Sequence, residues 1–243
     1  MSLEGLELEL FIDLVESMAV VIVVAYLFTR TKLFRQVLDR QLGRQGRLLL
    51  ILIFGAFSIW GTLSGVEIQE AIANTRNLGP ALGGLVGGPL VGLGAGVIGG
   101  LHRLSLGGWT AVPSALGTLA AGLAGGVVFL LFGRRVAPVW AAVLLAVFTE
   151  SVLMGLNLLM ARPFSEAVVL VEEVMLPMIL VNAAGMGLFV FIVPFVVQLP
   201  LRQGRRLTTK GTKNGYCIGA FRFAARHPTL YIPSARGTIC HYI

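Results

Sequence analysis

Long apolar runs alternate with short polar or basic segments over most of this chain. The runs cover residues 10–28, 48–66, 113–132, 136–160 and 176–199. Each run is close to the roughly 20 residues that a helix needs to cross a membrane. The pattern therefore predicts long membrane-spanning helices joined by polar loops.

The segment 72–114 differs from these runs because it is very rich in glycine and carries Arg76 and Arg103. Its glycines recur at spacings of three and four, so they share one face of a helix. Such smooth faces let helix backbones approach closely in a bilayer. Pro89 directly follows two glycines and favours a break. We predict two short, tightly packed helices with an arginine near each outer end.

The basic residues decide the predicted topology. The loop after the first run is strongly basic, so the positive-inside rule places it in the cytoplasm. A single span over 78–101 would put the later basic clusters, 134–135 and 202–206, outside. A break at Pro89 puts both clusters inside. It places three acidic residues in an outer loop: Glu166, Glu172 and Glu173.

The predicted fold is an all-α, polytopic membrane helix bundle with about six to seven crossings, including the short glycine-rich pair. Its N-terminus is expected outside and its C-terminus in the cytoplasm. Composition agrees, since 56% of residues are hydrophobic, 13% are charged, and the mean hydropathy is +0.85. The net charge of +7 sits mostly between apolar runs, which indicates membrane topology rather than nucleic-acid binding.

Two parts are predicted, a membrane domain over residues 1–202 and a tail over 203–243. The tail is basic, has no acidic residue and shows no sustained periodicity. We expect it to be a weakly ordered cytoplasmic segment. The acidic N-terminus does not resemble a signal peptide. No cofactor is predicted. No metal is predicted either, because the spacing of the cysteines and histidines in the tail matches no zinc pattern; these residues are Cys217, His227, Cys240 and His241.

Arg76 and Arg103 are the main candidates for ligand binding. Two guanidiniums near a helix start favour a carboxylate or phosphate, because arginine binds such groups in bidentate fashion. The alternative is that both side chains snorkel to the interface or pair with Glu67 and Glu70.

Hydroxyl and amide groups close to the arginines in sequence complete the predicted anion site. They are Asn74, Thr110 and Ser114. His102 could add a hydrogen bond, although a structural role is the simpler interpretation. Trp109 could line one side of the site or belong to the interfacial aromatic belt.

Three further polar residues lie within predicted spans: Glu150, Asn157 and Asn182. A charged, unpaired Glu150 would be costly in a membrane. Its carboxyl is expected to be protonated, paired with an arginine, or part of a proton or ligand path. The alternative is a simple hydrogen bond to Asn157, Asn182 or a hydroxyl on a neighbouring helix.

Three segments together resemble one family, the membrane sensor region of LytS-type histidine kinases. They read IANTRNLGPALGGLVGGPLVGLGAGVIGGLHR, GGWTA and ARPFSEAVVLVEEVMLPMILVNAAG, and the resemblance covers roughly residues 10–200. It implies a five-transmembrane receptor domain in the bacterial plasma membrane, a homodimer, and a role in cell-wall autolysis or pyruvate signalling. In pyruvate-sensing relatives the arginines matching Arg76 and Arg103 are the expected carboxylate contacts. Ser114 stands where those relatives carry a cysteine, and Gly117 where they carry a serine.

The family continues into a kinase core that passes phosphate to a response regulator, and the motifs of that core are missing from this sequence. The chain is therefore expected to have no kinase activity of its own and to reach a response regulator only through such a core. Two rival functions are a substrate-binding subunit of a small-molecule transporter and a non-liganded membrane assembly partner. Sensing of voltage instead of a ligand is a further alternative.

Overall fold

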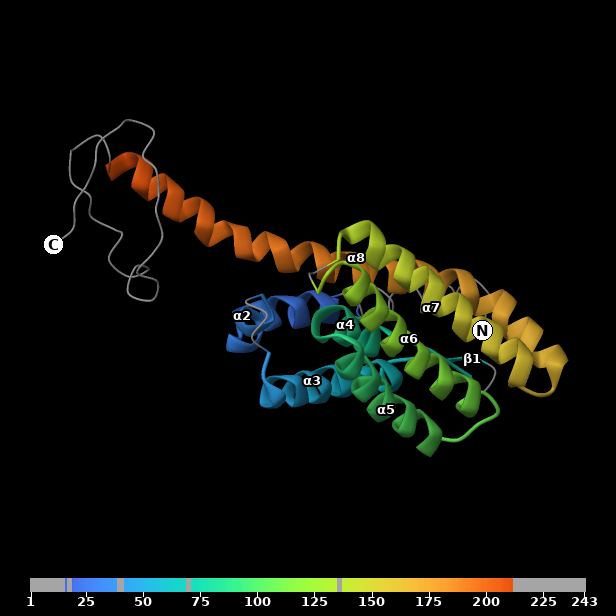
Figure 1. Cartoon of the computed structure of the whole chain (residues 1–243). Coiled ribbons are helices and arrows are strands. Elements are labelled where there is room, and N and C mark those ends of the chain that lie inside the picture. Colours follow the sequence, from blue (N-terminus) through green and yellow to red (C-terminus); the bar gives the residue numbers. More distant parts are fainter. Residues whose placement is uncertain (1–15, 17–18, 39–41, 69–70, 135–136, 212–243) are drawn as a thin grey trace. The chain divides into compact units, whose positions relative to one another are not determined.

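The computed structural model describes residues 16, 19–38, 42–68, 71–134 and 137–211. Within these ranges the only strands form one short hairpin, and all other regular elements are helices, which confirms the all-α membrane bundle (Figure 1). The elements are the helix Ala19–Arg30, α2 (Lys32–Leu38), α3 (Arg44–Leu63), β1 (Val66–Ile68), β2 (Ala71–Ala73), α4 (Leu78–Gly87), α5 (Pro89–Ser105), α6 (Ala111–Leu131), α7 (Val139–Met160) and α8 (Phe164–Gly211).

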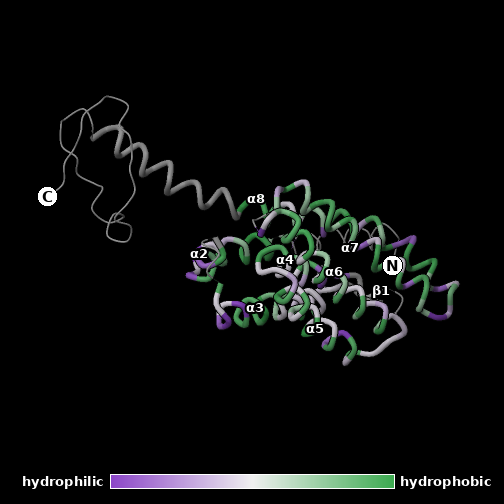
Figure 2. Tube along the Cα trace, in the orientation of Figure 1, coloured by the Kyte–Doolittle hydropathy of each residue, from purple (hydrophilic) through white to green (hydrophobic). Residues whose placement is uncertain are grey.

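Among the described residues, four helices are long and apolar enough to cross a membrane: α3, α6, α7 and the Phe164–Ile192 part of α8. Hydrophobic residues run along most of their length, as Figure 2 shows. Large apolar side chains such as Leu116, Leu144 and Leu180 face outward, which suits lipid rather than water. The protein is a multi-pass membrane protein. The first predicted span, 10–28, is described only from residue 19 onward, where it is helical.

The predicted break in the glycine-rich segment is confirmed. Gly88 has φ +86° and ψ −178°, a backbone conformation that essentially only glycine adopts. Pro89 follows as the first residue of α5, where its missing N–H costs nothing. The result is a pair of short helices, α4 with 10 residues and α5 with 17.

Glycines bring the backbones of α4, α5 and α6 into direct contact. A Cβ added to Gly122 would collide with the carbonyl of Gly92, and one added to Gly125 would collide with the carbonyl of Ala81. A Cβ on Gly84 would lie only 2.5 Å from the carbonyl oxygen of Gly122. These three helices therefore form a tightly packed unit of the kind that small residues permit in membranes.

On the other side of this unit, α3 packs against α4, where a Cβ on Gly79 would lie 2.5 Å from the Phe54 carbonyl oxygen. The Phe54 ring also contacts Phe28 and Phe189, with centroids 5.9 and 6.2 Å away. This aromatic cluster joins the helix Ala19–Arg30, α3 and α8 in one core.

The expected start of the last span at residue 176 is wrong, because α8 already begins at Phe164. Glu166, Glu172 and Glu173, which we placed in an outer loop, belong to this helix. The charges suggested a loop, but they alternate with buried apolar side chains such as Val171 and Val174, which is the pattern of a helix with one packed face.

The backbone of α8 continues as a helix to Gly211, past the tail boundary expected after residue 202. The chain divides into two compact units, Met1–Val196 and Val197–Ile243. Residues 212–243 lie outside the described part, so the tail stays a prediction. The cysteines and histidines that the sequence places there are outside it as well.

The hairpin of β1 and β2 was not expected from the sequence. The strands pair antiparallel, with Val66 opposite Ala73. The hairpin leads the chain from the end of α3 to Asn74–Asn77, where it enters the bundle. There, a Cβ on Gly61 would lie 2.9 Å from the backbone nitrogen of Arg76. A glycine in α3 thus allows the turn carrying Arg76 to lie against that helix.

Candidate functional site

One face of α6 carries a line of hydroxyl groups. Thr110, Ser114 and Thr118 follow one another at intervals of four residues, and all three are buried. With a rise of 1.5 Å per residue, the line extends for about 12 Å along the helix. The two predicted arginines contact the two ends of this line.

Arg103 lies in the last turn of α5 and is 1% exposed. Its Nη2 donates to the hydroxyl oxygen of Thr110 over 2.9 Å, and its Nη1 donates to the carbonyl oxygen of Gly107 over 2.5 Å. Within the described part of the chain, Nε has no hydrogen-bond partner. One donor nitrogen of this buried guanidinium, Nε, therefore remains unused.

Arg76 lies in the turn before α4 and is also 1% exposed. Its Nε donates to the hydroxyl oxygen of Thr118 over 2.8 Å, while Nη1 has no partner among the described residues. The backbone N–H of Arg76 donates to Asn74 Oδ1 over 3.1 Å. Asn74 thus helps to hold the turn that directs Arg76 into the bundle.

The two guanidiniums are close enough for their charges to interact. Ser114 lies on α6 between their two threonine partners, one helical turn from each. The structure therefore brings together four residues that the sequence placed in one site: Arg76, Arg103, Thr110 and Ser114. Thr118 was missed, although its spacing of four from Ser114 was a usable signal.

Glu150, on α7, is fully buried and joins the same cluster. Asn77 Nδ2 donates to Glu150 Oε1 over 3.1 Å, and Asn77 Oδ1 lies 3.1 Å from the Thr118 hydroxyl, which can donate to it. Glu150 is also near enough to Arg76 for an electrostatic interaction. The sequence suggested Asn157, Asn182 or a hydroxyl group as the partner of Glu150, but the amide that donates to its Oε1 is that of Asn77, while Asn182 lies near the carboxylate.

Asn157 and Asn182 are buried on α7 and α8. Within the described residues, Asn157 Oδ1 and both amide atoms of Asn182 have no hydrogen-bond partner. Asn182 lies near the Glu150 carboxylate, so α8 also borders the polar cluster. The side chains of Glu67 and Glu70, the alternative partners considered for the arginines, are outside the described residues.

The loop between α5 and α6 contacts the polar cluster at Arg103. Its Gly107 carbonyl contacts Arg103, and Trp109 packs against an apolar cluster from α7 and α8 that includes Leu153 and Met178. The α5–α6 loop therefore contacts both Arg103 and an apolar cluster that α7 and α8 share. His102 is only partly buried, and its Nδ1 lacks a partner in the part of the chain described.

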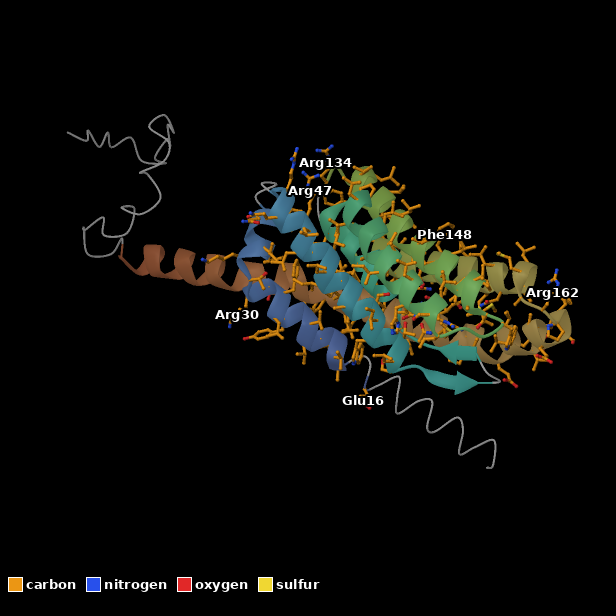
Figure 3. The ribbon with its side chains drawn as sticks, turned by 90° about the horizontal axis from the view of Figure 1, so that it is seen from below. Glu16, Arg30, Arg47, Arg134, Phe148 and Arg162 are labelled. Atoms are coloured by element: carbon orange, nitrogen blue, oxygen red, sulfur yellow. The ribbon has the colours of Figure 1, made fainter. Side chains whose placement is uncertain are left out.

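The labelled side chains in Figure 3 show two opposite ends of the bundle. Arg47 and Arg134 lie at one end, and Arg162 lies at the other. Because Arg103 and Thr110 close the α5–α6 connection, the hydroxyl line begins at the end of the bundle away from Arg134, which follows α6. The candidate site is thus nearer the end that carries Arg162.

This fold and site define a class of protein, a multi-pass membrane helix bundle with two arginines buried against one hydroxyl-lined helix. The family model described as "5TMR of 5TMR-LYT" matches residues 31–194, more than half of the chain. The chain belongs to this family of LytS-type five-transmembrane sensor regions.

Relatives with known names agree with this assignment. The Sensor protein LytS of Bacillus subtilis (strain 168) is 38% identical over 220 residues, which are 83% of this chain and 37% of that protein. The Sensor histidine kinase BtsS of Escherichia coli (strain K12) is 38% identical over 189 residues, 75% of this chain and 34% of that protein. The chain thus spans about a third of the length of these relatives. No solved structure matches this chain.

Proposed function

We propose that this chain is the transmembrane sensor domain of a two-component sensor histidine kinase. We propose that it binds a small external carboxylate between Arg76 and Arg103. The relatives carry the names Sensor protein LytS and Sensor histidine kinase BtsS. Kinase activity and phosphotransfer to a response regulator are expected of a catalytic core joined to this domain, not of the membrane helices.

The observation that carries the proposal is a pair of buried guanidiniums with unused donors. Arg76 Nη1 and Arg103 Nε have no partner among the described residues, although both side chains are 1% exposed. Leaving charged donors buried and unsatisfied costs free energy. A carboxylate can accept from both arginines, with one oxygen for each, and its negative charge strengthens both hydrogen bonds.

Entry of the carboxylate requires the α5–α6 loop to move, because both unused donors are inaccessible in this arrangement. Arg103 Nη1 donates a hydrogen bond to the Gly107 carbonyl oxygen. A carboxylate is a stronger acceptor for the same donor. Gly107 and Gly108 have φ of +71° and +87°, so this loop uses conformations that glycine adopts without strain. We infer that the ligand displaces the Gly107 carbonyl.

The same loop offers a route for the signal. Displacement of Gly107 would move Trp109, which packs against the apolar cluster that residues of α7 and α8 form together. A ligand shifts helix packing only as far as it binds one packing state better than the other. We propose that the ligand-bound loop favours a different packing position of α8 in the bundle. Helix α8 then transmits this shift across the membrane to a dimeric kinase core in the cytoplasm.

The orientation follows from charge. We propose a bacterial plasma membrane location with the basic end, marked by Arg47 and Arg134, in the cytoplasm and the α5–α6 loop outside. In this orientation the two arginines lie toward the external side of the membrane.

Ligand binding to the purified full chain in lipid nanodiscs tests the proposal. We expect pyruvate to bind with measurable heat in calorimetry, and acetamide, which has no charge, not to bind. Arg76→Gln and Arg103→Gln should each weaken pyruvate binding roughly tenfold to hundredfold, as loss of a charged hydrogen bond implies. The matched control is Arg162→Gln, because Arg162 is an exposed arginine whose Nη1 donates to the Ala161 carbonyl, away from the candidate site.

Equal affinity in wild type and in both site variants would contradict the anion site. The same preparation in sealed liposomes separates sensing from transport, because a sensor binds pyruvate without moving it across the membrane. Accumulation of labelled pyruvate inside the liposomes would favour the transporter alternative instead.

A further inference from the structure

Glu150 contributes a charge to this cluster that carboxylate binding itself does not require. Among the side chains that the structure describes, the buried ionisable ones are Arg76, Arg103 and Glu150, at 1%, 1% and 0% exposure. Two positive charges and one negative charge give this buried cluster a net charge of +1. No other described ionisable group is buried enough to change that sum.

The position of Glu150 is fixed by the same residues that hold Arg76. Asn77, the next residue after Arg76, donates to Glu150 Oε1 over 3.1 Å. The Thr118 hydroxyl lies 3.1 Å from Asn77 Oδ1 and accepts the hydrogen bond from Arg76 Nε. The carboxylate is therefore held beside the guanidinium through shared neighbours. Among the described residues, Glu150 Oε2 has no hydrogen-bond partner.

Burial disfavours the ionised form of the Glu150 carboxyl group, whereas the hydrogen bond from Asn77 and the positive charge of Arg76 favour it. Glu150 interacts electrostatically with Arg76, and Arg76 with Arg103. Two buried guanidiniums without a counter-charge would be more costly still, because charges far from water need compensation. Glu150 is thus the resident counter-charge for half of the positive charge at this site.

We propose that Glu150 is a specificity-determining residue that restricts the site to ligands with a single negative charge. The proposal rests on the carboxylate site described above and names the class of ligand that fits it. A monoanion brings the buried charge to zero. A dianion leaves one uncompensated negative charge beside the Glu150 carboxylate, where the low dielectric strengthens the repulsion.

A matched ligand pair isolates charge from shape. Malonate and its monoamide, malonamate, have nearly the same size, but above neutral pH malonate carries two negative charges and malonamate carries one. Binding of each to the full chain in nanodiscs gives a ratio of affinities. We expect the wild-type protein to bind malonamate at least about tenfold more tightly than malonate, a difference of about 1.4 kcal/mol.

The informative variant is Glu150→Gln, which keeps an oxygen for Asn77 but removes the charge. We expect the preference for malonamate over malonate to fall at least about tenfold, because the site then carries two uncompensated positive charges. Glu150→Asp keeps the charge and should keep the preference. An unchanged ratio in Glu150→Gln would overturn the proposal, as would a wild-type protein that binds malonate as tightly as malonamate.

A second variant tests the same idea from α8 and serves if Glu150→Gln does not fold. Asn182 is buried near Glu150, and both of its amide atoms lack a partner in the described residues. Asn182→Asp adds a second negative charge and should weaken malonamate binding at least about tenfold, whereas the uncharged isostere Asn182→Leu should not. Equal binding by these two variants would overturn the proposal.

Failure of this inference is distinguishable from failure of the carboxylate site. If Arg76→Gln loses malonamate binding while Glu150→Gln keeps the wild-type ratio, the site stands and only the role of Glu150 falls. If Arg76→Gln binds malonamate like wild type, the site itself is wrong.

Discussion

Arg76 donates a hydrogen bond from Nε to the hydroxyl oxygen of Thr118 over 2.8 Å, although 42 positions separate the two residues. The contact joins the turn before α4 to the middle of α6. It also orients the guanidinium so that Nη1 stays unused. The hydroxyl of Thr118 thus positions the arginine that we propose to bind the ligand.

Thr118→Val should weaken both folding and ligand binding. The substitution keeps the side-chain shape but leaves Arg76 Nε buried without an acceptor. Loss of a hydrogen bond to a charged group costs about 1.5–3 kcal/mol. We expect a lower thermal midpoint in detergent and weaker pyruvate binding in calorimetry.

Thr149→Val is the matched control, because Thr149 is also buried but its hydroxyl donates only to the Ala146 carbonyl of its own helix. It should lower the midpoint less and leave pyruvate affinity unchanged. If both valine variants bound pyruvate equally well, the positioning role of Thr118 would be wrong.

Gly122→Ala should destabilise the bundle, because the new methyl group would collide with the Gly92 carbonyl where α5 and α6 touch. Overpacking typically costs about 1–3 kcal/mol, and a backbone neighbour has little freedom to yield. The measurement is the thermal midpoint of the purified protein in detergent. Gly155→Ala on α7 is the control, since nothing lies within 4 Å of its added Cβ. A midpoint shift of the same size in both variants would contradict the close-packed crossing.

Gly88→Ala should be destabilising for a different reason. The residue has φ +86° and ψ −178°, and an alanine there costs about 1–3 kcal/mol in backbone strain. Its Cβ would also lie 3.2 Å from the Phe129 ring. Gly43→Ala is the control, because Gly43 has φ −71° and open space around its Cβ position. We expect a lower thermal midpoint only for Gly88→Ala, and equal midpoints would show that the break tolerates a side chain.

The proposed orientation predicts which surface positions react with a membrane-impermeant maleimide on intact cells. In a background with Cys217 and Cys240 changed to Ser, Ser105→Cys and Ser165→Cys should be labelled, because both lie at the external end. Gln45→Cys, exposed at the start of α3, should be labelled only after the cells are opened. Labelling of Gln45→Cys on intact cells would reverse the topology.

Much of the fold could be read from local features of the sequence. The apolar runs located α3, α6 and α7 to within a few residues, because a span must have a certain length of apolar chain. The acidic residues Glu172 and Glu173 misled the placement of α8, since charge alone does not distinguish a loop from the exposed face of a helix. The β1–β2 hairpin was missed because its strands have only three residues each.

The candidate site was only partly predictable. Spacing placed Thr110 and Ser114 on one helical face, and glycine pairing suggested that Arg76 and Arg103 approach each other. Asn77 and Thr118 were not singled out, because neither is unusual in sequence. Their importance appears only where Asn77 reaches Glu150, 73 positions further along the chain.

The sequence by itself determined the membrane-spanning character of the chain and the break between α4 and α5. It also placed an arginine near each outer end of this helix pair. These follow from the length of apolar runs and from the backbone rules of glycine and proline, which act over a few neighbouring residues. Only the tertiary structure decided that Arg76 lies on Thr118 and that Glu150 shares its neighbours. Those contacts depend on which helix faces which, and this is set by backbone approach at residues such as Gly92 and Gly122, far apart in the chain.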